Sequence, residues 1–352
     1  MRRYTLFCII ICNIIIVIMS CSDKKDHTSH KNSELIALSD FGKEIHLLGE
    51  DIEFEEIVFN PYKMIIKDSI LVLYNVRTEF VFQTFNLNNF KYMGEHVLFG
   101  QGPNEMIRPT FIQTQDSNIW ILDTEKQMVF QYFPNDFIAK KEPIPVKIIN
   151  LKIETDQLSL IEEQFFGAKM LESTKSRFVL FDMNGDSIYT RGIFPPNNID
   201  FTYQETTYGY TSNYVTNFKD RIFLTHYFTD LIEIYDTAGN LINRIQGPDY
   251  FLPHVKEYKT EDISFGYSKE DARVAYSAPA NAGDEVFVIY SGGLYSEDNG
   301  HKKNILVFDW NGKPIRKYEL DKPVYGITID IKNRYIYGLS DIPECHVVRF
   351  KY

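Results

Sequence analysis

The chain has 352 residues, of which 44% are hydrophobic and 15% aromatic, and its formal net charge is −11. This length allows two ordinary domains or one large closed β architecture, and the excess of Tyr and Phe favours sheet over helix. The strong negative charge repels phosphate backbones, so we expect no nucleic acid among the partners.

The first twenty residues have the pattern of an export signal. Arg2 and Arg3 precede an apolar run over residues 6–19, which is shorter than the roughly 20 apolar residues that a membrane span needs. The end of this run, Ile18-Met19-Ser20-Cys21, resembles the lipobox of bacterial lipoproteins, in which the cysteine carries the acyl chains and becomes the new N-terminus. We therefore expect a signal peptide at residues 1–20 and lipidation at Cys21. The alternative is an ordinary signal peptide beside an incidental cysteine.

Residues 21–33 are polar and lack apolar periodicity, which is typical of a flexible tether. A folded domain is expected over residues 34–352. A lipidated Cys21 would anchor this domain at the outer membrane or the cell surface, with a periplasmic orientation as the alternative. Removal of Arg2 and Arg3 with the signal peptide changes the formal charge from −11 to −13.

Three hairpins, at residues 178–189, 232–242 and 305–315, repeat one pattern. Each has alternating apolar residues that end in an aromatic residue, then Asp, two further residues and Gly. A tight hairpin needs a side chain that bonds its own backbone and then a residue free to take positive φ, and this pattern supplies both. Similar motifs begin calcium loops, but the further ligands of such a loop are missing, so we interpret the motifs as turns.

The hairpins belong to a longer repeat, with equivalent positions at Asn86, Phe133, Asp182, Asp236 and Asp309. The intervals between these positions are 47, 49, 54 and 73 residues, and four strands per interval of this length are typical of a β-propeller blade. The last interval predicts an insertion, and the strand pattern lapses over residues 250–283. Because the chain ends with only three strands, the N-terminal segment near Ile45 is expected to supply the fourth. The sequence thus predicts an all-β fold, a six-bladed β-propeller whose last blade is closed by an N-terminal strand.

Residues 100–133 resemble an NHL-type blade, with Gly-x-Gly, a proline before the second strand, an aliphatic-rich strand ending in Asp and an apolar third strand. From about Glu44 onward, the chain resembles the TolB-like six-bladed propeller lipoproteins of Bacteroidetes-type bacteria. The motifs that carry this resemblance are Gly100-Gln101-Gly102-Pro103-Asn104-Glu105, Ile289-Tyr290-Ser291-Gly292-Gly293 leading to Val307-Phe308-Asp309-Trp310-Asn311-Gly312, and Tyr325-Gly326-Ile327. The resemblance implies only a fold and a cellular location. Residues 157–167 depart from it, because they are acidic and irregular and lack the Gly-Pro start.

Motifs for catalysis are missing from the sequence. The eight histidines are dispersed and form neither H-x-H nor H-E-x-x-H, and G-x-S-x-G and phosphate-binding Gly-rich loops are also missing. Six-bladed propellers similar to calcium-dependent lactonases hold their metal with Asp, Asn and Glu from several blades at the central channel. Such ligands would be scattered in sequence, so a calcium-dependent hydrolase or lyase with its site in that channel is the alternative function.

The most suggestive cluster of side chains is aromatic and lies before the fourth blade. It consists of Phe201, Tyr203, Tyr208, Tyr210 and Tyr214, with Gln204 and Asn213 between them, and the loop that carries Tyr295 is a candidate to join it. Flat amphipathic rings with amides nearby suit a glycan, which they bind by stacking and hydrogen bonds. The commoner explanation is that such loops pack on the propeller face.

These observations favour a monomeric, lipid-anchored and non-catalytic module that needs no cofactor and binds a protein or glycan partner. The candidate ligand-binding residues are Tyr203, Tyr208, Tyr210, Tyr214 and Tyr295. A subunit that scaffolds an outer-membrane assembly is a third hypothesis.

Overall fold

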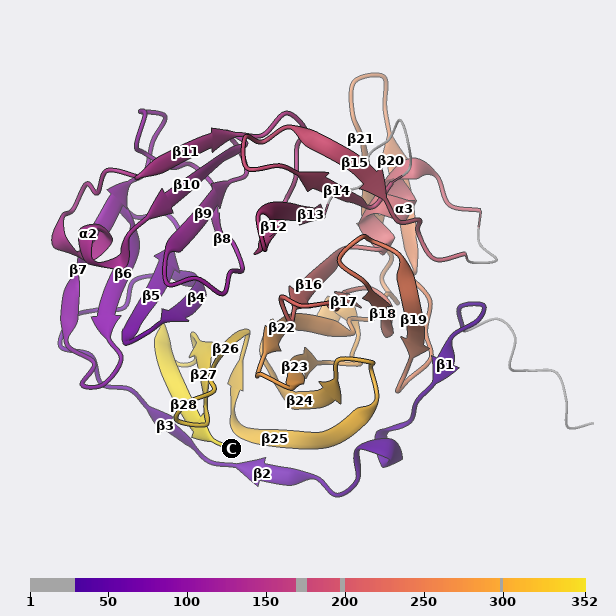
Figure 1. The fold of residues 1–352 in the computed structure, drawn as a ribbon. Helices are drawn as coiled ribbons and strands as arrows, with labels where there is room; N and C mark the ends of the chain where they lie inside the picture. The colour runs from indigo at the N-terminus through magenta and orange to yellow at the C-terminus, as the bar shows by residue number, and fades with distance from the viewer. Residues whose placement is uncertain (1–28, 169–175, 197–199, 298–299) are drawn as a thin grey trace, which may run out of the picture.

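The computed structural model describes residues 29–168, 176–196, 200–297 and 300–352 (Figure 1). Cys21 and the expected signal peptide at residues 1–20 lie outside these ranges. The described chain forms six sheets of four or five strands arranged in a ring, which confirms the predicted six-bladed β-propeller (Figure 1).

Each blade is built mainly from strands that follow one another in the chain, with the first strand nearest the ring centre (Figure 1). Blade one contains β4 (Pro61–Lys67), β5 (Ile70–Asn75), β6 (Phe80–Asn86) and β7 (Tyr92–Leu98). Blade two contains β8 (Pro109–Phe111), β9 (Ile119–Asp123), β10 (Met128–Tyr132) and β11 (Lys147–Asn150). Blade three contains β12 (Gln157–Ile161), β13 (Gln164–Ala168), β14 (Phe178–Phe181) and β15 (Ser187–Arg191).

The second half of the ring has the same plan with added edge strands. Blade four contains β16 (Ser212–Thr216), β17 (Ile222–His226), β18 (Leu231–Tyr235), β19 (Leu241–Gln246) and β1 (Glu34–Leu35). Blade five contains β22 (Tyr276–Asn281), β23 (Glu285–Tyr290), β24 (Lys302–Asp309), β25 (Pro314–Val324) and β2 (Ile45–Leu47). Blade six contains β26 (Gly326–Asp330), β27 (Tyr335–Ser340), β28 (His346–Lys351) and β3 (Gly49–Asp51).

The middle strands are buried on both faces, because each blade is covered by two neighbours. Every residue of β5, β9 and β18 is buried, whereas the outer strand β15 has no buried residue. Six clusters of buried apolar side chains fill the junctions between neighbouring blades, one for each junction. The cluster between blades six and one, which includes Leu71, Leu73, Tyr337 and Leu339, completes the ring.

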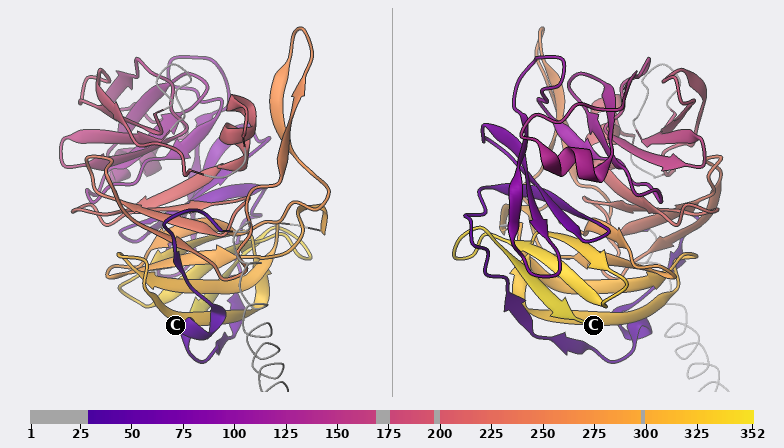
Figure 2. Two further views of the ribbon diagram at one scale, coloured as in Figure 1. Left: turned by 90° about the vertical axis from the view of Figure 1, so that its right-hand side faces the viewer. Right: turned by 60° about the vertical axis from the view of Figure 1, so that its left-hand side comes forward.

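The N-terminal segment runs along the outer edges of three successive blades, and we call residues 34–51 the N-terminal belt (Figure 2). β1 pairs in parallel with β19, β2 pairs in parallel with β25, and β3 pairs antiparallel with β28. The strand near Ile45 was expected in the last blade, but Ile45 lies opposite Tyr318 of blade five. The outer strand of blade six is instead β3, Gly49–Asp51, which follows β2 in the chain with only Leu48 between them.

The predicted hairpin turns are confirmed in detail. In the first, Asp182 Oδ1 accepts hydrogen bonds from the backbone N–H groups of Asn184 (2.8 Å) and Asp186 (3.0 Å), and Gly185 takes a φ of +86°. Gly312 occupies the same position in blade five with a φ of +87°. These values explain why the motif needs an Asp and a Gly.

Several elements differ from the expectation. In the described part of the chain, two short α-helices, α2 (Pro134–Ala139) and α3 (Tyr203–Gly209), and two 3-10 turns, η1 (Leu38–Phe41) and η2 (Tyr295–Glu297), lie in connections. The long interval before Asp309 contains an extra hairpin of β20 (Val255–Lys259) and β21 (Ser264–Ser268). Residues 157–167, expected to be irregular, form β12 and β13, because their acidic pair Glu162-Glu163 is confined to the turn between the two strands.

Gly312 offers a test of this packing, with Gly283 as a matched control. A Cβ at Gly312 would lie 1.9 Å from Cδ1 of Ile245, whereas at Gly283 (φ +83°) the nearest atom is 3.8 Å away. Alanine at either position incurs the left-handed backbone cost of about 1–2 kcal/mol. Only Gly312→Ala must also repack the junction between blades four and five, which adds about 1–3 kcal/mol. Chemical unfolding should show the larger loss for Gly312→Ala, and equal losses would contradict this account of the junction.

Candidate functional site

Insertions gather at one end of blades four and five, and one of them extends well beyond the ring (Figure 2). α3 lies in the connection before blade four, the β20–β21 hairpin in the connection after it, and Tyr295 in a loop of blade five. Figure 2 shows the hairpin projecting from the body of the propeller. This end therefore carries much of the chain that a plain propeller does not need.

α3 is anchored to the hairpin by close contacts. Thr202 caps the helix by accepting a hydrogen bond from the Glu205 N–H (3.2 Å), and Glu205 Oε2 accepts from the Thr202 N–H (2.9 Å). The other oxygen of Glu205 accepts from the Glu257 N–H of β20 (3.1 Å). Gly266 of β21 lies so close to the helix that an added Cβ would be 2.5 Å from Cβ of Tyr208. One face of the hairpin is thus covered by α3.

The opposite face of the hairpin is exposed, and we call it the hairpin face. Register places Lys256 opposite Tyr267 and Tyr258 opposite Phe265, so these four side chains share that face. The rings of Tyr258 and Phe265 lie 5.2 Å apart, and the two residues are 49% and 47% exposed. The sequence prediction missed this face. The signal was present, because Lys256-Glu257-Tyr258 and Phe265-Gly266-Tyr267 alternate with period two.

The structure brings two of the five predicted ligand-binding tyrosines together. Tyr208 stacks on Phe228 with a centroid distance of 4.9 Å, and Phe228 packs edge-on against Tyr295 at 5.4 Å. Tyr203 is half-buried on the first turn of α3. Burial raises the pKa of Tyr208 above its ordinary value. The loop with Tyr295 therefore does join the cluster, as the sequence suggested.

Tyr210 and Tyr214 lie in the interior instead, with only 2% and 3% of their surface exposed. Tyr214 donates a hydrogen bond from its hydroxyl to the carbonyl of Phe166 (2.8 Å) in blade three, and burial raises its pKa. Tyr210 packs edge-on against His226 at 5.7 Å. For these two rings, the structure follows the alternative explanation of packing.

A buried ionic network lies beneath Tyr210, at the junction of blades three and four. The carboxylate of Glu233 is fully buried and bonds both Arg177 and Arg244, the latter through Nε (2.9 Å) and Nη2 (2.7 Å). Burial, reinforced by the charge of Arg177, holds the pKa of His226 well below its ordinary value. Neutral His226 can then accept a hydrogen bond from Arg177 through Nε2 (2.6 Å) and donate one to the Leu231 carbonyl through Nδ1 (3.0 Å). Because these groups are closed to solvent, the network holds two blades together and offers no open catalytic site.

His30, which the sequence prediction assigns to the tether, reaches this region and is only 3% exposed. Its backbone N–H donates to the Gln246 side chain (2.7 Å), and its ring lies 5.7 Å from that of Tyr210. Burial lowers the pKa of His30 to about 3. The packed part of the chain therefore begins before residue 34.

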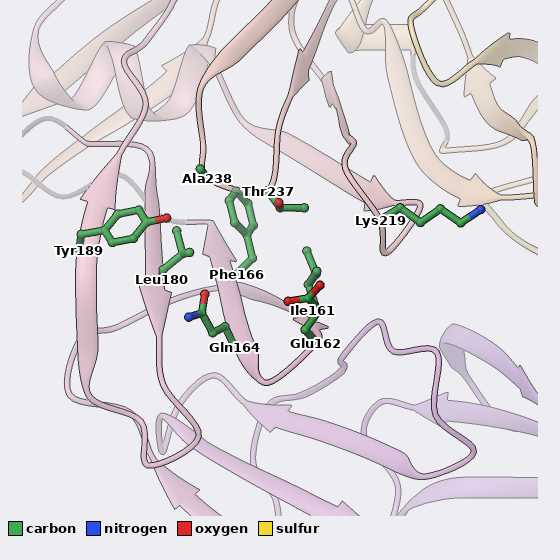
Figure 3. A pocket seen from close by; sticks show the side chains of 9 residues that line it. All are labelled: Ile161, Glu162, Gln164, Phe166, Leu180, Tyr189, Lys219, Thr237 and Ala238. Atoms are coloured by element: carbon green, nitrogen blue, oxygen red, sulfur yellow. The ribbon is translucent and has the colours of Figure 1, made fainter.

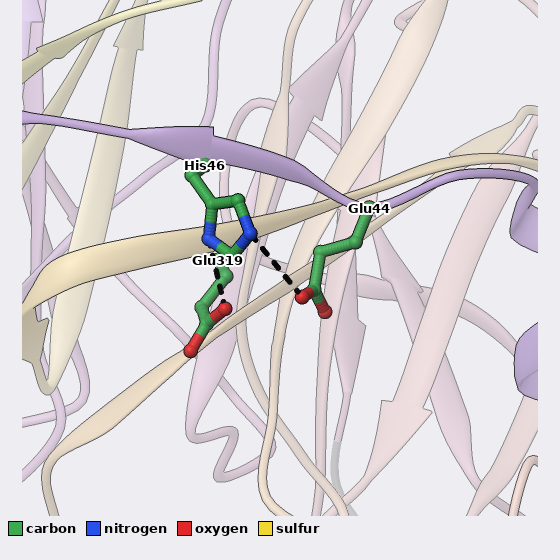
Figure 4. Close-up of side chains that lie close together, drawn as sticks. All are labelled: Glu44, His46 and Glu319. Carbon is green, nitrogen blue, oxygen red and sulfur yellow. Dashed lines mark ion pairs between the residues drawn. The ribbon is translucent and has the colours of Figure 1, made fainter.

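Within the described ranges, one group of three side chains is close enough to share a metal ion, namely Glu44, His46 and Glu319 (Figure 4). His46 Nδ1 lies 2.9 Å from Glu319 Oε2, and His46 Nε2 lies 3.8 Å from Glu44 Oε1. The two carboxylates thus contact opposite nitrogens of the ring, and Lys317 forms an ion pair with Glu44 that lowers the pKa of its carboxyl. This group joins the belt to the outer edge of blade five and is remote from the central channel that the hydrolase hypothesis requires.

The fold is that of a six-bladed β-propeller with insertions at one end of blades four and five. The sequence model of the family described as "TolB-like 6-blade propeller-like" matches residues 40–332, so the chain belongs to this family. No curated protein matches it.

Two solved structures have the same fold. A member of the DUF4221 family from Bacteroides vulgatus ATCC 8482 is 11% identical, with 88% of this chain and 97% of that chain covered and a TM-score of 0.58. A protein of Bacteroides fragilis NCTC 9343 described as exported is 13% identical, with 91% and 98% of the two chains covered and a TM-score of 0.51. At these identities, the comparison establishes the fold alone.

Removal of the Glu233 carboxylate should be severely destabilising. Glu233→Ala would leave the Arg177 and Arg244 guanidinium groups buried without their counterion, which costs about 3–5 kcal/mol. Glu50→Ala is the matched control, because Glu50 forms an exposed pair with Arg349 that water screens. Chemical unfolding should show a large loss for Glu233→Ala and little change for Glu50→Ala. Similar behaviour of both variants would show that the buried network is not structural.

The three buried histidines, His30, His96 and His226, each have a pKa lowered by burial and together predict a loss of stability in mild acid. In the unfolded chain, histidine titrates near pH 6.5, whereas His30 stays neutral until about pH 3 in the folded protein. The unfolded state therefore binds more protons below pH 6.5, and each such histidine removes about 1.4 kcal/mol of stability per pH unit as the pH falls. His30→Gln should have a shallower slope than the wild type between pH 6.5 and 5.5. Parallel slopes in chemical unfolding at these pH values would refute the assignment.

Proposed function

We propose that this protein is a lipid-anchored propeller of the cell envelope that acts as a non-catalytic binding module for a protein or glycan partner. The observation that carries the proposal is the hairpin face, where Tyr258 and Phe265 are each about half exposed on a projecting hairpin. Exposed aromatic groups of this kind are typical of binding surfaces. In this proposal, the hairpin face contacts the partner, and α3, which carries Tyr203 and Tyr208, supports the hairpin from its opposite face.

A protein partner is favoured over a glycan at this face. Ile263, in the turn of the hairpin, is 56% exposed, and an aliphatic side chain offers no hydrogen bond to a sugar. Lys256 adds a positive charge beside the rings. Aromatic residues with a cation at their edge suit the apolar centre and polar rim of a protein interface.

The expected location at the outer membrane or cell surface rests on the lipobox-like segment that ends at Cys21. A protein with the same fold is described as exported, which supports a location outside the cytoplasm. In the part of the chain that the structure describes, no helix has the length and apolar character of a membrane span. A lipid at Cys21 would supply the anchor.

Replacing the exposed rings should remove binding and leave the fold intact. Tyr258→Ser combined with Phe265→Ser deletes two half-exposed rings, so the melting temperature should stay near that of the wild type. Quantitative mass spectrometry of material captured from solubilised envelopes should show at least about tenfold depletion of the specific partner, because central aromatic contacts are worth about 2 kcal/mol or more. A glycan array probed with the same two proteins tests the glycan alternative.

Ile188→Ser provides the control, because Ile188 is 46% exposed on β15 of blade three. This variant should retain the captured partner. If the double variant captures the same material as the wild type, the hairpin face is not the binding surface.

The anchor has its own test. Cys21→Ala should move the protein from the detergent-rich phase to the aqueous phase in a detergent phase separation and should abolish incorporation of labelled fatty acid. Cys345→Ala, which removes the free cysteine in blade six, should change neither result. Retention of Cys21→Ala in the detergent phase would contradict lipidation at this residue.

A further inference from the structure

Lys63 lies in the junction between blades one and two, beside the central channel. It is on β4, the strand of blade one nearest the ring centre, and its amino group donates a hydrogen bond to Oγ1 of Thr110 (2.9 Å) on β8, the inner strand of blade two (Figure 1). Lys67 donates to the carbonyl of Thr114 (3.3 Å) across the same junction. Both contacts join residues 47 apart, so the inner strands of the two blades run parallel and begin at the same end of the ring.

Lys63 is half-buried and has no counterion. Within the described ranges, its amino group forms no ion pair with a carboxylate, and burial lowers its pKa with no acidic group to oppose the fall. The arginines buried between blades three and four, by contrast, share the carboxylate of Glu233. An ammonium group has three donors, and Thr110 accepts one of them. Because an unpaired charge is costly to bury, Lys63 is suited to receive an anion.

Arg108 brings a second cation to this junction. The N–H of Thr124 donates to the carbonyl of Arg108 (3.0 Å), so the ladder of β8 and β9 continues as far as Arg108. Side chains alternate along a strand, so Arg108 and Thr110 share one face of blade two. Thr110 bonds Lys63, and that face is therefore turned toward blade one. Arg108 is exposed, and its guanidinium forms no hydrogen bond or ion pair with the residues that the structure describes.

Two tyrosines of blade one complete the group. Tyr74 of β5 is directly opposite Lys63 in the register of β4 and β5, and Tyr62 packs edge-on against it with ring centres 6.0 Å apart. Burial raises the pKa of Tyr74, and the charge of Arg108 opposes that rise, which places the guanidinium near this ring. The amino group of Lys63 lies 5.7 Å from the centre of the Tyr62 ring, and Tyr62 is 58% exposed. We call Tyr62, Lys63, Tyr74 and Arg108 the Lys63 cluster.

The charges around the Lys63 cluster favour an anion. The net charge of the chain is −11, yet the innermost strands of the six blades contain two lysines, Lys63 and Lys67, and one acid, Asp330. Asp330 accepts hydrogen bonds from the backbone N–H (3.0 Å) and Nδ2 (2.8 Å) of Asn333 in its own turn. Asp123 lies near the cluster, but it is buried and its carboxylate accepts from four backbone N–H groups. Both acids thus have local partners and do not neutralise the two cations of the cluster.

A cleft of about 240 Å³ between blades three and four offers no comparable site (Figure 3). Its lining includes the carboxylate of Glu162, and Lys219 points its amino group away from the other labelled side chains in Figure 3. Its floor, with Phe166 and Leu180, is covered by the packing of the two blades. Glu162 follows the end of β12, whereas the Lys63 cluster is at the start of the parallel strand β4, so the two lie at opposite ends of the ring.

The donors of the Lys63 cluster suit a carboxylate. The planar fork of Arg108 matches the two oxygens of a carboxylate, and Lys63 adds a point charge. Phosphate sites commonly add backbone N–H groups, but β4 and β8 begin with Pro61 and Pro109, which have none. The exposed ring of Tyr62 offers a flat apolar surface beside the charges. A small molecule with a carboxylate attached to a ring fits these features.

We propose that the Lys63 cluster binds a small organic carboxylate at the start of the inner strands of blades one and two. Lys63 and Arg108 bond the carboxylate, and the ring of Tyr62 contacts the rest of the ligand. The hydroxyls of Tyr62 and Tyr74, which form no hydrogen bond with the described residues, supply further donors. The hairpin face belongs to the connection between blades four and five, across the ring, so the two surfaces are separate (Figure 1).

The test uses the full-length protein in detergent and two matched pairs of probes, benzoate with benzamide and methyl glucuronide with methyl glucoside. Each pair keeps the ring and differs in the carboxylate. Saturation-transfer NMR at millimolar concentration should detect binding of at least one carboxylate, and its neutral partner should bind about tenfold more weakly or less. Inorganic phosphate at the same concentration should not displace that carboxylate. Binding of neither carboxylate, equal binding of the neutral partner, or displacement by phosphate would overturn the proposal.

Variants locate the site. Arg108→Gln removes an exposed charge, so the melting temperature should stay near that of the wild type while the carboxylate binds about tenfold more weakly or less. Lys63→Met keeps the length of the side chain and removes its charge, and it should weaken binding by a similar factor. Unchanged affinity in both variants would refute the assignment to the Lys63 cluster.

Lys67→Met is the matched control for the loss of charge. Lys67 is on the same strand, but its amino group already donates to the carbonyls of Thr114 and Asp116 (2.8 Å). This variant should therefore bind the carboxylate as the wild type does. An equal loss of affinity in Lys67→Met and Lys63→Met would show a general effect of charge in the channel and would overturn the specific site.

Discussion

The structure depends on one constraint, which is that a four-stranded blade has two apolar faces and both must be covered. A single blade buries neither face, and an open row of blades would leave its first and last faces in water. The ring solves this, since every blade then lies between two neighbours and the middle strands β5, β9 and β18 are buried along their whole length. The junction of blades six and one, with Leu71 and Leu73 against Tyr337 and Leu339, is therefore as necessary as any other.

The N-terminal belt addresses a second constraint, the outer edges of the sheets. An unpaired outer strand exposes a row of backbone N–H and C=O groups that other chains can pair with. β1, β2 and β3 cover such edges in blades four, five and six in succession. Between β1 and β2, Phe41 is buried and packs edge-on against Phe308 of blade five at 5.2 Å. The belt thus adds apolar packing to its backbone pairing, which fixes the path of the chain between blades.

The repeat could be read from the sequence because hairpin turns follow local rules. The motif with Asp182 and Gly185 encodes its own hydrogen bonds and its positive φ, so it identifies strand ends without knowledge of the rest of the fold. The belt register could not be derived in this way. The strand with Ile45 and the strand that begins at Gly49 can each pair with the exposed edge of a sheet. Which of them joins blade five and which joins blade six depends on where β25 and β28 lie in space.

The candidate site was less predictable for the same reason. Tyr208 and Tyr214 stand only six residues apart in one aromatic-rich stretch, but Tyr214 is on the inner strand β16 and its hydroxyl donates to a carbonyl of blade three, a partner 48 residues away. One buried contact, however, can be inferred from the sequence. Glu233 lies in the middle of the apolar strand Leu231–Tyr235, and a charge in a fully buried strand requires a partner, which Arg177 and Arg244 supply.

These placements change the role of the aromatic-rich loop before blade four. A two-stranded hairpin alone is at best marginally stable in water, so β20 and β21 need support before they can present side chains. α3 provides it, with one oxygen of Glu205 completing the helix cap and the other bonding β20, and with Tyr208 against Gly266. The helix therefore occupies one face of the hairpin. The exposed rings of Tyr258 and Phe265 are on the other face, so residues 203–209 hold the contact surface in position more than they form it.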